Sequence, residues 1–123
     1  MSYHVVDPDD LEPFSDRPVD ARSISDAAGL ENVGLRRYDV DPGEQMPLAY
    51  HYHEQQEEAF FVVEGTLHVE TPDTEFVVEA GEVFVAEPDS PHRAFNPDDV
   101  SRPVRVFAVG APAVDDVERY DGG

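Results

Sequence analysis

The segment from residue 51 to 65, HYHEQQEEAFFVVEG, contains side chains that could bind a metal ion. His51 and His53 are separated by one residue, so on a β-strand both side chains point to the same face. Glu58 follows five residues after His53, and on one continuous strand it would point to the opposite face. A hairpin turn at residues 54–57 lets Glu58 open the next strand and face the two histidines.

Two imidazoles and a carboxylate on one face need a chemical explanation. Buried polar groups require partners, and a divalent cation satisfies two histidines and a glutamate together. The alternative is a solvated pair of histidines, since so short a pattern as His-x-His occurs often by chance. A second segment, GEVFVAEPDSPHRAFN at residues 81–96, adds His92 and favours the metal site.

The first of these segments resembles a cupin motif, G(X)5HXH(X)3,4E(X)6G. The matching residues are Gly43, His51, His53, Glu58 and Gly65. Only the first gap departs, with seven residues in place of five, and it falls in an expected loop, where insertions are tolerated.

The second segment resembles the other cupin motif, G(X)5PXG(X)2H(X)3N. Gly81, His92 and Asn96 match at the expected spacings, whereas Glu87 replaces the proline and Asp89 replaces the glycine. Aspartate adopts positive φ more readily than most residues, so the turn at Asp89 can persist. We interpret Glu87 as a surface carboxylate, the alternative being a carboxylate near the mouth of the site.

The cupin resemblance implies an all-β fold, a double-stranded β-helix (jelly-roll) barrel with a metal inside. It implies that His51, His53, Glu58 and His92 hold the metal. Three imidazole nitrogens and one carboxylate oxygen suit one divalent transition metal: Fe, Mn, Ni, Cu or Zn. Four protein ligands on an octahedral ion leave two positions at which substrate, water or dioxygen could bind.

Short β-type runs separated by Gly and Pro cover most of the chain after residue 30, and this spacing is typical of an antiparallel sandwich or barrel. The runs lie at residues 34–40, 51–53, 59–63, 66–70, 75–81, 82–87 and 103–112. The segment between the motifs, residues 66–80, predicts a hairpin.

Two parts are expected along the chain. Residues 1–30 are rich in Asp, Pro and Ser and predict an extended N-terminal arm, with one helical turn at residues 25–28 ended by Gly29. Residues 31–123 then form the barrel domain. The polar C-terminal segment is expected on the surface or paired with a neighbouring strand.

Several residues outside the motifs carry weaker expectations. Met46, Phe60 and Val62 could form the walls of a substrate pocket, although ordinary core packing explains them equally well. His68 alternates with apolar neighbours and is expected to face solvent or a partner subunit.

Arg36 and Arg37 are adjacent in an expected strand, so they point to opposite faces. One of them could point inward and bind a substrate anion, and the alternative is an exposed arginine in a salt-bridged face. A sugar-phosphate substrate is disfavoured because the chain has no Lys, and phosphate binding would need Arg36, Arg37 or Arg93.

Acidic residues dominate the charge. The 123 residues include 28 Asp and Glu against 8 basic residues, which gives a formal net charge of −20. Such a surface repels nucleic acids and anionic membranes. All the basic residues are Arg, a composition that resembles cytoplasmic proteins of salt-loving archaea, the alternative being an acidic protein of a mesophile.

The remaining sequence features predict a cytoplasmic protein. There is no Cys, which excludes disulfides and thiolate chemistry, and we find neither a signal peptide pattern nor an apolar run of membrane-spanning length. Small cupins generally dimerise, so we expect a homodimer in which the arm or the C-terminal strand packs on the partner.

Two functional classes stay open at this point. The cupin resemblance implies a metal-dependent enzyme acting on a small organic molecule, of dioxygenase or isomerase type. The second class is a non-enzymatic, metal-dependent small-ligand-binding protein, because a fold does not determine a function. The sequence identifies no catalytic residue.

Overall fold

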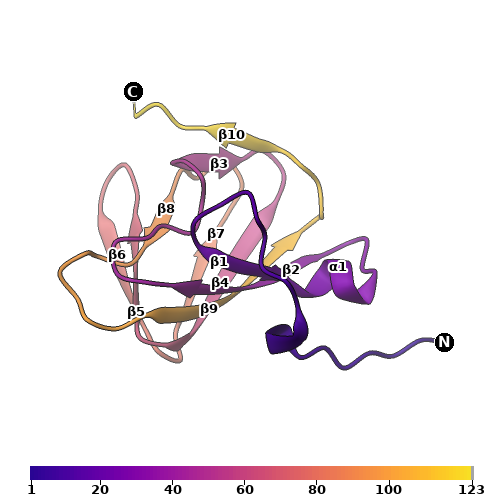
Figure 1. Cartoon of the computed structure of the whole chain (residues 1–123). Helices are drawn as coiled ribbons and strands as arrows, with labels where there is room; N and C mark the ends of the chain where they lie inside the picture. Colours follow the sequence, from indigo (N-terminus) through magenta and orange to yellow (C-terminus); the bar gives the residue numbers. More distant parts are fainter. Residues whose placement is uncertain (123) are drawn as a thin grey trace.

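Ten β-strands form three antiparallel sheets within residues 1–122, which the computed structural model describes (Figure 1). The five-stranded sheet has the order β1 (Asp20–Ser23), β2 (Gly34–Val40), β9 (Val104–Ala111), β4 (Glu57–Glu64) and β7 (Val83–Ala86). A three-stranded sheet has the order β6 (Glu75–Glu79), β5 (Thr66–Glu70) and β8 (Arg93–Phe95). The third sheet pairs β10 (Val117–Arg119) with β3 (His51–His53). The helical elements are η1 (Pro8–Asp10) and α1 (Ile24–Ala28).

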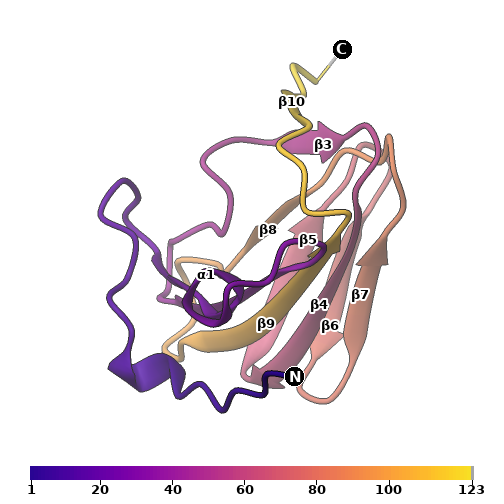
Figure 2. The same cartoon turned by 90° about the vertical axis from the view of Figure 1, so that its right-hand side faces the viewer.

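The core lies between the two larger sheets. Along β9, buried residues alternate with more exposed ones, as expected for a strand with one face on the core. Val62 and Val106 of the five-stranded sheet and Leu67 and Val69 of β5 are fully buried. Strands β3 and β10 lie together at one end of this sandwich (Figure 2).

The all-β architecture expected from the sequence is present, and most expected strands match. The hairpin between the motifs is present as β5 and β6, which pair from Thr66 with Glu79 to Glu70 with Glu75. Strands β1 and β8 were not expected, because each has only three or four residues and lacks a clear apolar alternation. Strand β10 lies in the polar C-terminal segment, for which surface exposure or pairing was expected.

The expected hairpin at residues 54–57 is wrong, although the chain does turn there. Both edges of β4 are occupied, by β7 on one side and β9 on the other, so β3 cannot pair with it. Instead β3 pairs with β10, and the turn carries the chain from the end of the barrel into the five-stranded sheet. The alternation of side-chain faces in a β3–β4 hairpin therefore does not explain why Glu58 faces the histidines.

The part of the N-terminal segment from η1 onward is bound to the barrel of its own chain. Helix α1 ends at Gly29 as expected, but β1 pairs with β2, and Val19 and Ala21 belong to the core. Arg37 contacts Asp9 at 2.8 Å, which attaches η1 to β2. A boundary at residue 30 stays a prediction, and strand pairing begins before it.

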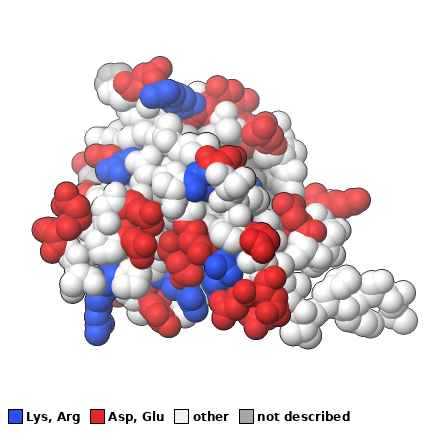
Figure 3. All heavy atoms as spheres, in the orientation of Figure 1, with Lys and Arg blue, Asp and Glu red and all other residues white. Residues whose placement is uncertain are grey.

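Acidic side chains are distributed over the molecular face drawn in Figure 3, with few basic side chains between them. No helix among residues 1–122 is long and apolar enough to span a membrane. The charge imbalance lowers the stability of the fold, because the negatively charged carboxylates on a small surface repel each other.

We expect the melting temperature to rise from dilute buffer to molar KCl. The charge of −20 disfavours the compact state, and molar salt reduces the Debye length to roughly 3 Å, which screens this repulsion. Calorimetry across a KCl series measures the effect. A melting temperature that stays constant over the series contradicts this prediction.

Candidate metal centre

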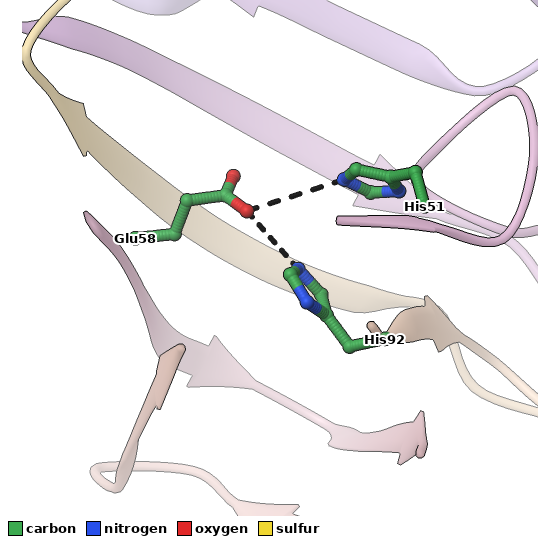
Figure 4. Close-up of side chains that lie close together, drawn as sticks. All are labelled: His51, Glu58 and His92. Atoms are coloured by element: carbon green, nitrogen blue, oxygen red, sulfur yellow. Dashed lines mark hydrogen bonds and ion pairs between the residues drawn. The ribbon is translucent and has the colours of Figure 1, made fainter. Parts of the chain in front are cut away.

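Three ligand atoms from distant parts of the chain converge at the end of the barrel near β3. Atoms of His51, Glu58 and His92 lie within 4.8 Å of one another, so this group could hold a metal ion. Figure 4 shows both rings pointing a nitrogen at the same carboxylate oxygen. Oε1 of Glu58 lies 3.0 Å from Nε2 of His92 and 4.0 Å from Nε2 of His51.

Backbone pairing positions the two histidines of this group. His51 and His92 form an isolated antiparallel bridge, in which the His92 N–H donates to the His51 carbonyl at 2.9 Å. The turn before His92 contains Asp89 with φ of 62°, as expected for the residue that replaces the motif glycine. The Asp89 N–H donates to the carbonyl of His53 at 2.7 Å, which holds this turn against β3.

His53 approaches the same carboxylate from β3. Its Nε2 lies 3.2 Å from Oε1 of Glu58, and its ring meets the His51 ring edge-on with centroids 4.9 Å apart. His53 thus contacts Glu58, but the group of ligand atoms within 4.8 Å of one another consists of His51, Glu58 and His92 and does not include His53. Glu58 lies at the centre of the three histidines, with its Oε1 facing the Nε2 atoms of all three rings.

Hydrogen bonds fix the orientation of each imidazole. Nδ1 of His51 faces the Ala49 carbonyl at 3.1 Å, and Nδ1 of His92 faces the Ser90 carbonyl at 2.8 Å. Nδ1 of His53 faces a carboxylate oxygen of Asp116 at 2.9 Å. These oxygens only accept, so each Nδ1 carries a hydrogen. Each Nε2 is directed at Glu58: it donates to the carboxylate when the ring is protonated, and its lone pair could bind a metal when the ring is neutral.

The pKa shifts show which groups are charged. Burial opposes ionisation of Glu58, but hydrogen bonds and charge from His53 and His92 outweigh it and lower its pKa to about 2. Burial and the neighbouring His92 lower the pKa of His51. Burial also disfavours charged His53, yet Glu58 and Asp116 outweigh it and raise the pKa of His53. The site thus has an ionised carboxylate at neutral pH.

The donor chemistry fits a divalent transition metal. Imidazole nitrogens with a carboxylate oxygen are ligands that Fe, Mn, Ni, Cu and Zn accept. Lone pairs of several nitrogens directed at one carboxylate oxygen repel it unless a proton or a cation lies between them. A cation bound by His51, Glu58 and His92 would satisfy these atoms together.

The candidate metal centre opens into a cavity of about 750 Å³. Glu58 lies in one row with Gly110 of β9 and Gly34 of β2, and all three line the cavity. A Cβ atom added at Gly110 would lie 2.6 Å from the side-chain amide of Gln56, so this glycine makes room for Gln56, which also lines the cavity. The volume is that of a small-molecule site.

Two of the three expected pocket-wall residues line this cavity. Met46 and Phe60 belong to its wall, and both are nearly fully buried. Val62 is not among the lining residues; it is fully buried in the core. Val62 is two residues after Phe60 in β4, so it lies on the same face of the sheet, but it is fully buried in the core.

Asp116 is the site residue that sequence reasoning missed. Its carboxylate accepts the Nδ1 hydrogen of His53 and also the backbone N–H groups of Gln55, at 2.6 Å, and Gln56, at 2.9 Å. Burial raises the pKa of Asp116, but these hydrogen bonds outweigh it and leave the pKa lowered. Nothing in the local sequence distinguishes Asp116 from Asp115, because only the β3–β10 pairing brings it to His53.

The structure places the remaining expected residues outside the metal centre or beside it. Arg36 lines the cavity, whereas Arg37 is buried on the opposite face and ion-paired with Asp9. His68 pairs with Glu75 at 3.1 Å and lies away from the ligand group. Glu87 is exposed on the surface, as interpreted from the sequence.

A sequence profile described as "Cupin domain" matches residues 36–110, more than half of the chain. The chain belongs to the cupin family. The profile includes all four residues that the cupin motifs predicted as ligands, whereas Asp116 lies beyond its end. A search of curated proteins finds no match to this cupin.

Solved structures share the cupin fold at low sequence identity. A sugar phosphate isomerase of the cupin superfamily from Silicibacter pomeroyi is 24% identical with a TM-score of 0.76, over 88% of this chain and 75% of that one. The polyketide cyclase RemF from Streptomyces resistomycificus is 22% identical with a TM-score of 0.77, over 96% and 85%. A structure from Acidithiobacillus ferrooxidans is 22% identical with a TM-score of 0.68, and this cupin covers 58% of its length.

Proposed function

We propose that this cupin binds one divalent transition metal, Fe, Mn, Ni, Cu or Zn, through His51, His53, Glu58 and His92. We further propose that it is a metal-dependent enzyme acting on a small organic molecule, of dioxygenase or isomerase type. The observation that carries the proposal is the convergence of three Nε2 atoms on one carboxylate oxygen in the wall of a cavity.

The surrounding residues support chemistry at this position. A bound metal would supply either a Lewis acid that polarises a carbonyl or a redox centre. The Nδ1 hydrogen bonds keep the rings oriented, and the apolar walls at Met46 and Phe60 exclude water from a bound molecule. The isomerase and cyclase among the structural neighbours are compatible with the proposal, but their identities with this chain are too low to transfer an activity.

A non-enzymatic metal-dependent ligand-binding protein is the second candidate. It is favoured by one observation: among the residues that line the cavity, no additional histidine or cysteine stands ready to transfer a proton or attack a substrate. Binding alone needs only the metal and the cavity walls.

Metal analysis followed by oxygen uptake separates these candidates. The metal content of protein from its native source decides between a redox and a non-redox centre. Protein loaded anaerobically with Fe(II) is then mixed with catechols, thiols and diketones while dissolved oxygen is measured. Uptake that depends on substrate supports a dioxygenase, and zinc with no uptake turns the proposal toward an isomerase or a binder.

Replacing Asp116 with asparagine should lower metal affinity about 10- to 100-fold, the usual effect of losing a carboxylate behind a ligand histidine. Asparagine keeps the size of the side chain but removes the charge that orients His53 and increases its basicity. Zn(II) titration against a chromophoric chelator measures the affinity. Glu118→Gln is the control, because Glu118 is an exposed carboxylate of β10 that does not line the cavity. Equal affinities for both variants contradict the role of Asp116.

We propose that the protein is a homodimer formed through the outer face of the five-stranded sheet. Exposed apolar side chains gather there: Phe61, Val83, Val85 and Val109. The arm or the C-terminal strand expected from the sequence is the alternative contact, since Tyr3 and Val5 before η1 and Val117 of β10 are also exposed. Two copies that each carry a net charge of −20 repel each other, and this repulsion is weakest where uncharged faces meet.

Light scattering in molar KCl tests the assembly. A mass of twice 13.7 kDa is expected, and Val85→Glu, at the most exposed of the four positions, should reduce it to that of a monomer. Glu82→Gln, an exposed change beside the face, is the control. A parent mass near 13.7 kDa contradicts the dimer.

A further inference from the structure

Arg36 differs from the other half-buried and buried arginines of residues 1–122, because it has no carboxylate within ion-pair distance. The ion-paired arginines are Arg17, Arg22, Arg37, Arg93, Arg105 and Arg119. Arg102 is also without such a partner, but it is exposed to solvent. The chain has 28 acidic residues for 8 basic ones, so carboxylates are numerous enough to form an ion pair with every guanidinium. An unpaired one inside this chain needs another explanation.

Two aromatic residues hold the Arg36 side chain in place. Its Nη1 donates to the Tyr38 hydroxyl at 3.3 Å, and its guanidinium carbon lies 4.9 Å from the centre of the Phe14 ring. A guanidinium has five N–H donors. Among residues 1–122 the other donors of Arg36 meet no protein acceptor, and Arg36 lines the cavity. The side chain is oriented, while most of its hydrogen-bonding capacity stays available to a ligand.

The sheet register places Arg36 in the same cavity as the metal centre. Arg36, Ala108 and Phe60 form one row across β2, β9 and β4. The next row along the same face contains Glu58. Arg36 and Glu58 lie two strands apart across the sheet and two residues apart along it. Their Cα atoms are therefore about 12 Å apart. The small side chain of Ala108 leaves space between the guanidinium and Phe60.

We propose that Arg36 binds the carboxylate of a small organic acid whose opposite end faces His51, Glu58 and His92. This inference rests on the proposed function, because it assigns the substrate class of that site. Arginine binds carboxylates through two parallel hydrogen bonds, and it is preferred over lysine where that geometry matters. Arg17 and Arg119 also line the cavity, but they are ion-paired with Asp16 and Asp121. The one cavity guanidinium without an ion pair balances the single charge of a carboxylate. A phosphate ester carries nearly two charges and would face further repulsion from this acidic chain.

The walls between the two ends suit the carbon part of such an acid. Phe60 and Met46 are apolar and line the cavity that also contains Arg36 and the metal centre. A carboxylate also has to overcome the repulsion of a protein with a net charge of −20, so binding needs a positive group at the point of contact. Arg36 supplies that group, whereas the other charged cavity side chain of the same sheet, Glu58, is negative.

Three probes that share a phenyl ring test the proposal: benzoate, phenyl phosphate and benzyl alcohol. Each is titrated calorimetrically into metal-free and Zn(II)-loaded protein at one fixed KCl concentration. We expect benzoate to bind both forms and to bind more tightly than phenyl phosphate or benzyl alcohol. Zn(II) content is measured in the same samples, so loss of the metal site and loss of the anion site are distinguished.

Arg36→Gln should weaken benzoate binding about tenfold or more while Zn(II) content stays that of the parent, since charge-assisted hydrogen bonds are lost. Arg36→Lys keeps the charge but not the planar fork and should weaken binding severalfold; it decides the matter if Arg36→Gln fails to fold. Arg102→Gln, an exposed arginine outside the cavity, is the matched control and should bind as the parent does.

Several results overturn the proposal. Benzoate binding that is unchanged in Arg36→Gln, or in Arg36→Lys where the first variant does not fold, removes Arg36 as the anion site. Benzyl alcohol that binds as tightly as benzoate, or no binding of any probe, removes the anionic substrate class. Phenyl phosphate that binds more tightly than benzoate replaces the carboxylate by a phosphate ester. Absence of Zn(II) from the parent, with benzoate binding retained, refutes the proposed metal function alone.

Discussion

Replacing His92 with alanine is expected to abolish metal-dependent stabilisation of this cupin. The imidazole of His92 is 2% exposed and lies 3.0 Å from the Glu58 carboxylate, so no water or neighbouring side chain replaces it easily. The loss of affinity should exceed the about 10- to 100-fold effect typical of residues behind the ligands. The result would establish that a residue 34 positions after Glu58 completes the site.

The measurement is the shift in melting temperature on adding metal. A metal that binds only the folded state at a hundredfold excess over its dissociation constant stabilises the fold by about 2.7 kcal/mol. For a domain of this size the melting temperature should rise by roughly ten degrees, and a chelator should reverse the rise. His92→Ala should show almost no shift, whatever its metal-free stability.

Two further variants make this result decisive. His92→Gln fills the position better than alanine and should also lose the shift, which separates loss of the ligand from loss of packing. His68→Ala is the control, since His68 pairs with Glu75 outside the metal centre. A normal metal shift in His92→Ala, or none in His68→Ala, shows that the ligand assignment is wrong.

Acid should act in the same direction as the chelator. Protons compete with metal for the histidines, and the raised pKa of His53 means that this competition begins above pH 6.5. Glu58, with a pKa of about 2, stays ionised throughout this range and does not cause the loss. The metal-dependent stabilisation is therefore present above neutral pH and lost as the pH falls through the pKa of His53. Metal affinity independent of pH between 8 and 5 contradicts histidine ligation.

The second large effect is expected for Gly65→Ala, which should destabilise the fold by about 3 kcal/mol or more. Gly65, between β4 and β5, has φ of 78°, where any side chain is strained. A Cβ atom there would also lie 2.5 Å from the Pro103 carbonyl oxygen and 3.1 Å from the Val104 Cα, both backbone atoms. The main chain must move, so strain and overlap add. Chemical denaturation of the metal-free protein measures the change in unfolding free energy.

Gly81→Ala is the matched control for this prediction. Gly81 has φ of 91°, but an added Cβ meets no atom within 4 Å. Its cost should be about 1–2 kcal/mol, the strain of the backbone conformation alone. If Gly65→Ala and Gly81→Ala lower the unfolding free energy equally, the chain relieves the close approach to Pro103 without a further loss of stability, which contradicts the prediction.

The sequence could predict the features that depend on local pattern. Alternating apolar residues and turn residues located most strands, and the two cupin motifs identified the fold and the set of candidate ligands. The positive φ of Asp89 also followed from its place in the second motif. These predictions succeed because a strand's faces, a turn's backbone and a motif's spacing are all properties of neighbouring residues.

Only the tertiary structure decided the partners of those residues. Parity in the sequence placed Arg36 and Arg37 on opposite faces, but closure of the barrel determined that Arg36 faces the cavity. In the same way Asp116 reaches His53 only because β10 pairs with β3 across more than 60 residues of chain. Such contacts depend on which sheet edges remain unoccupied after folding, and no local pattern records that.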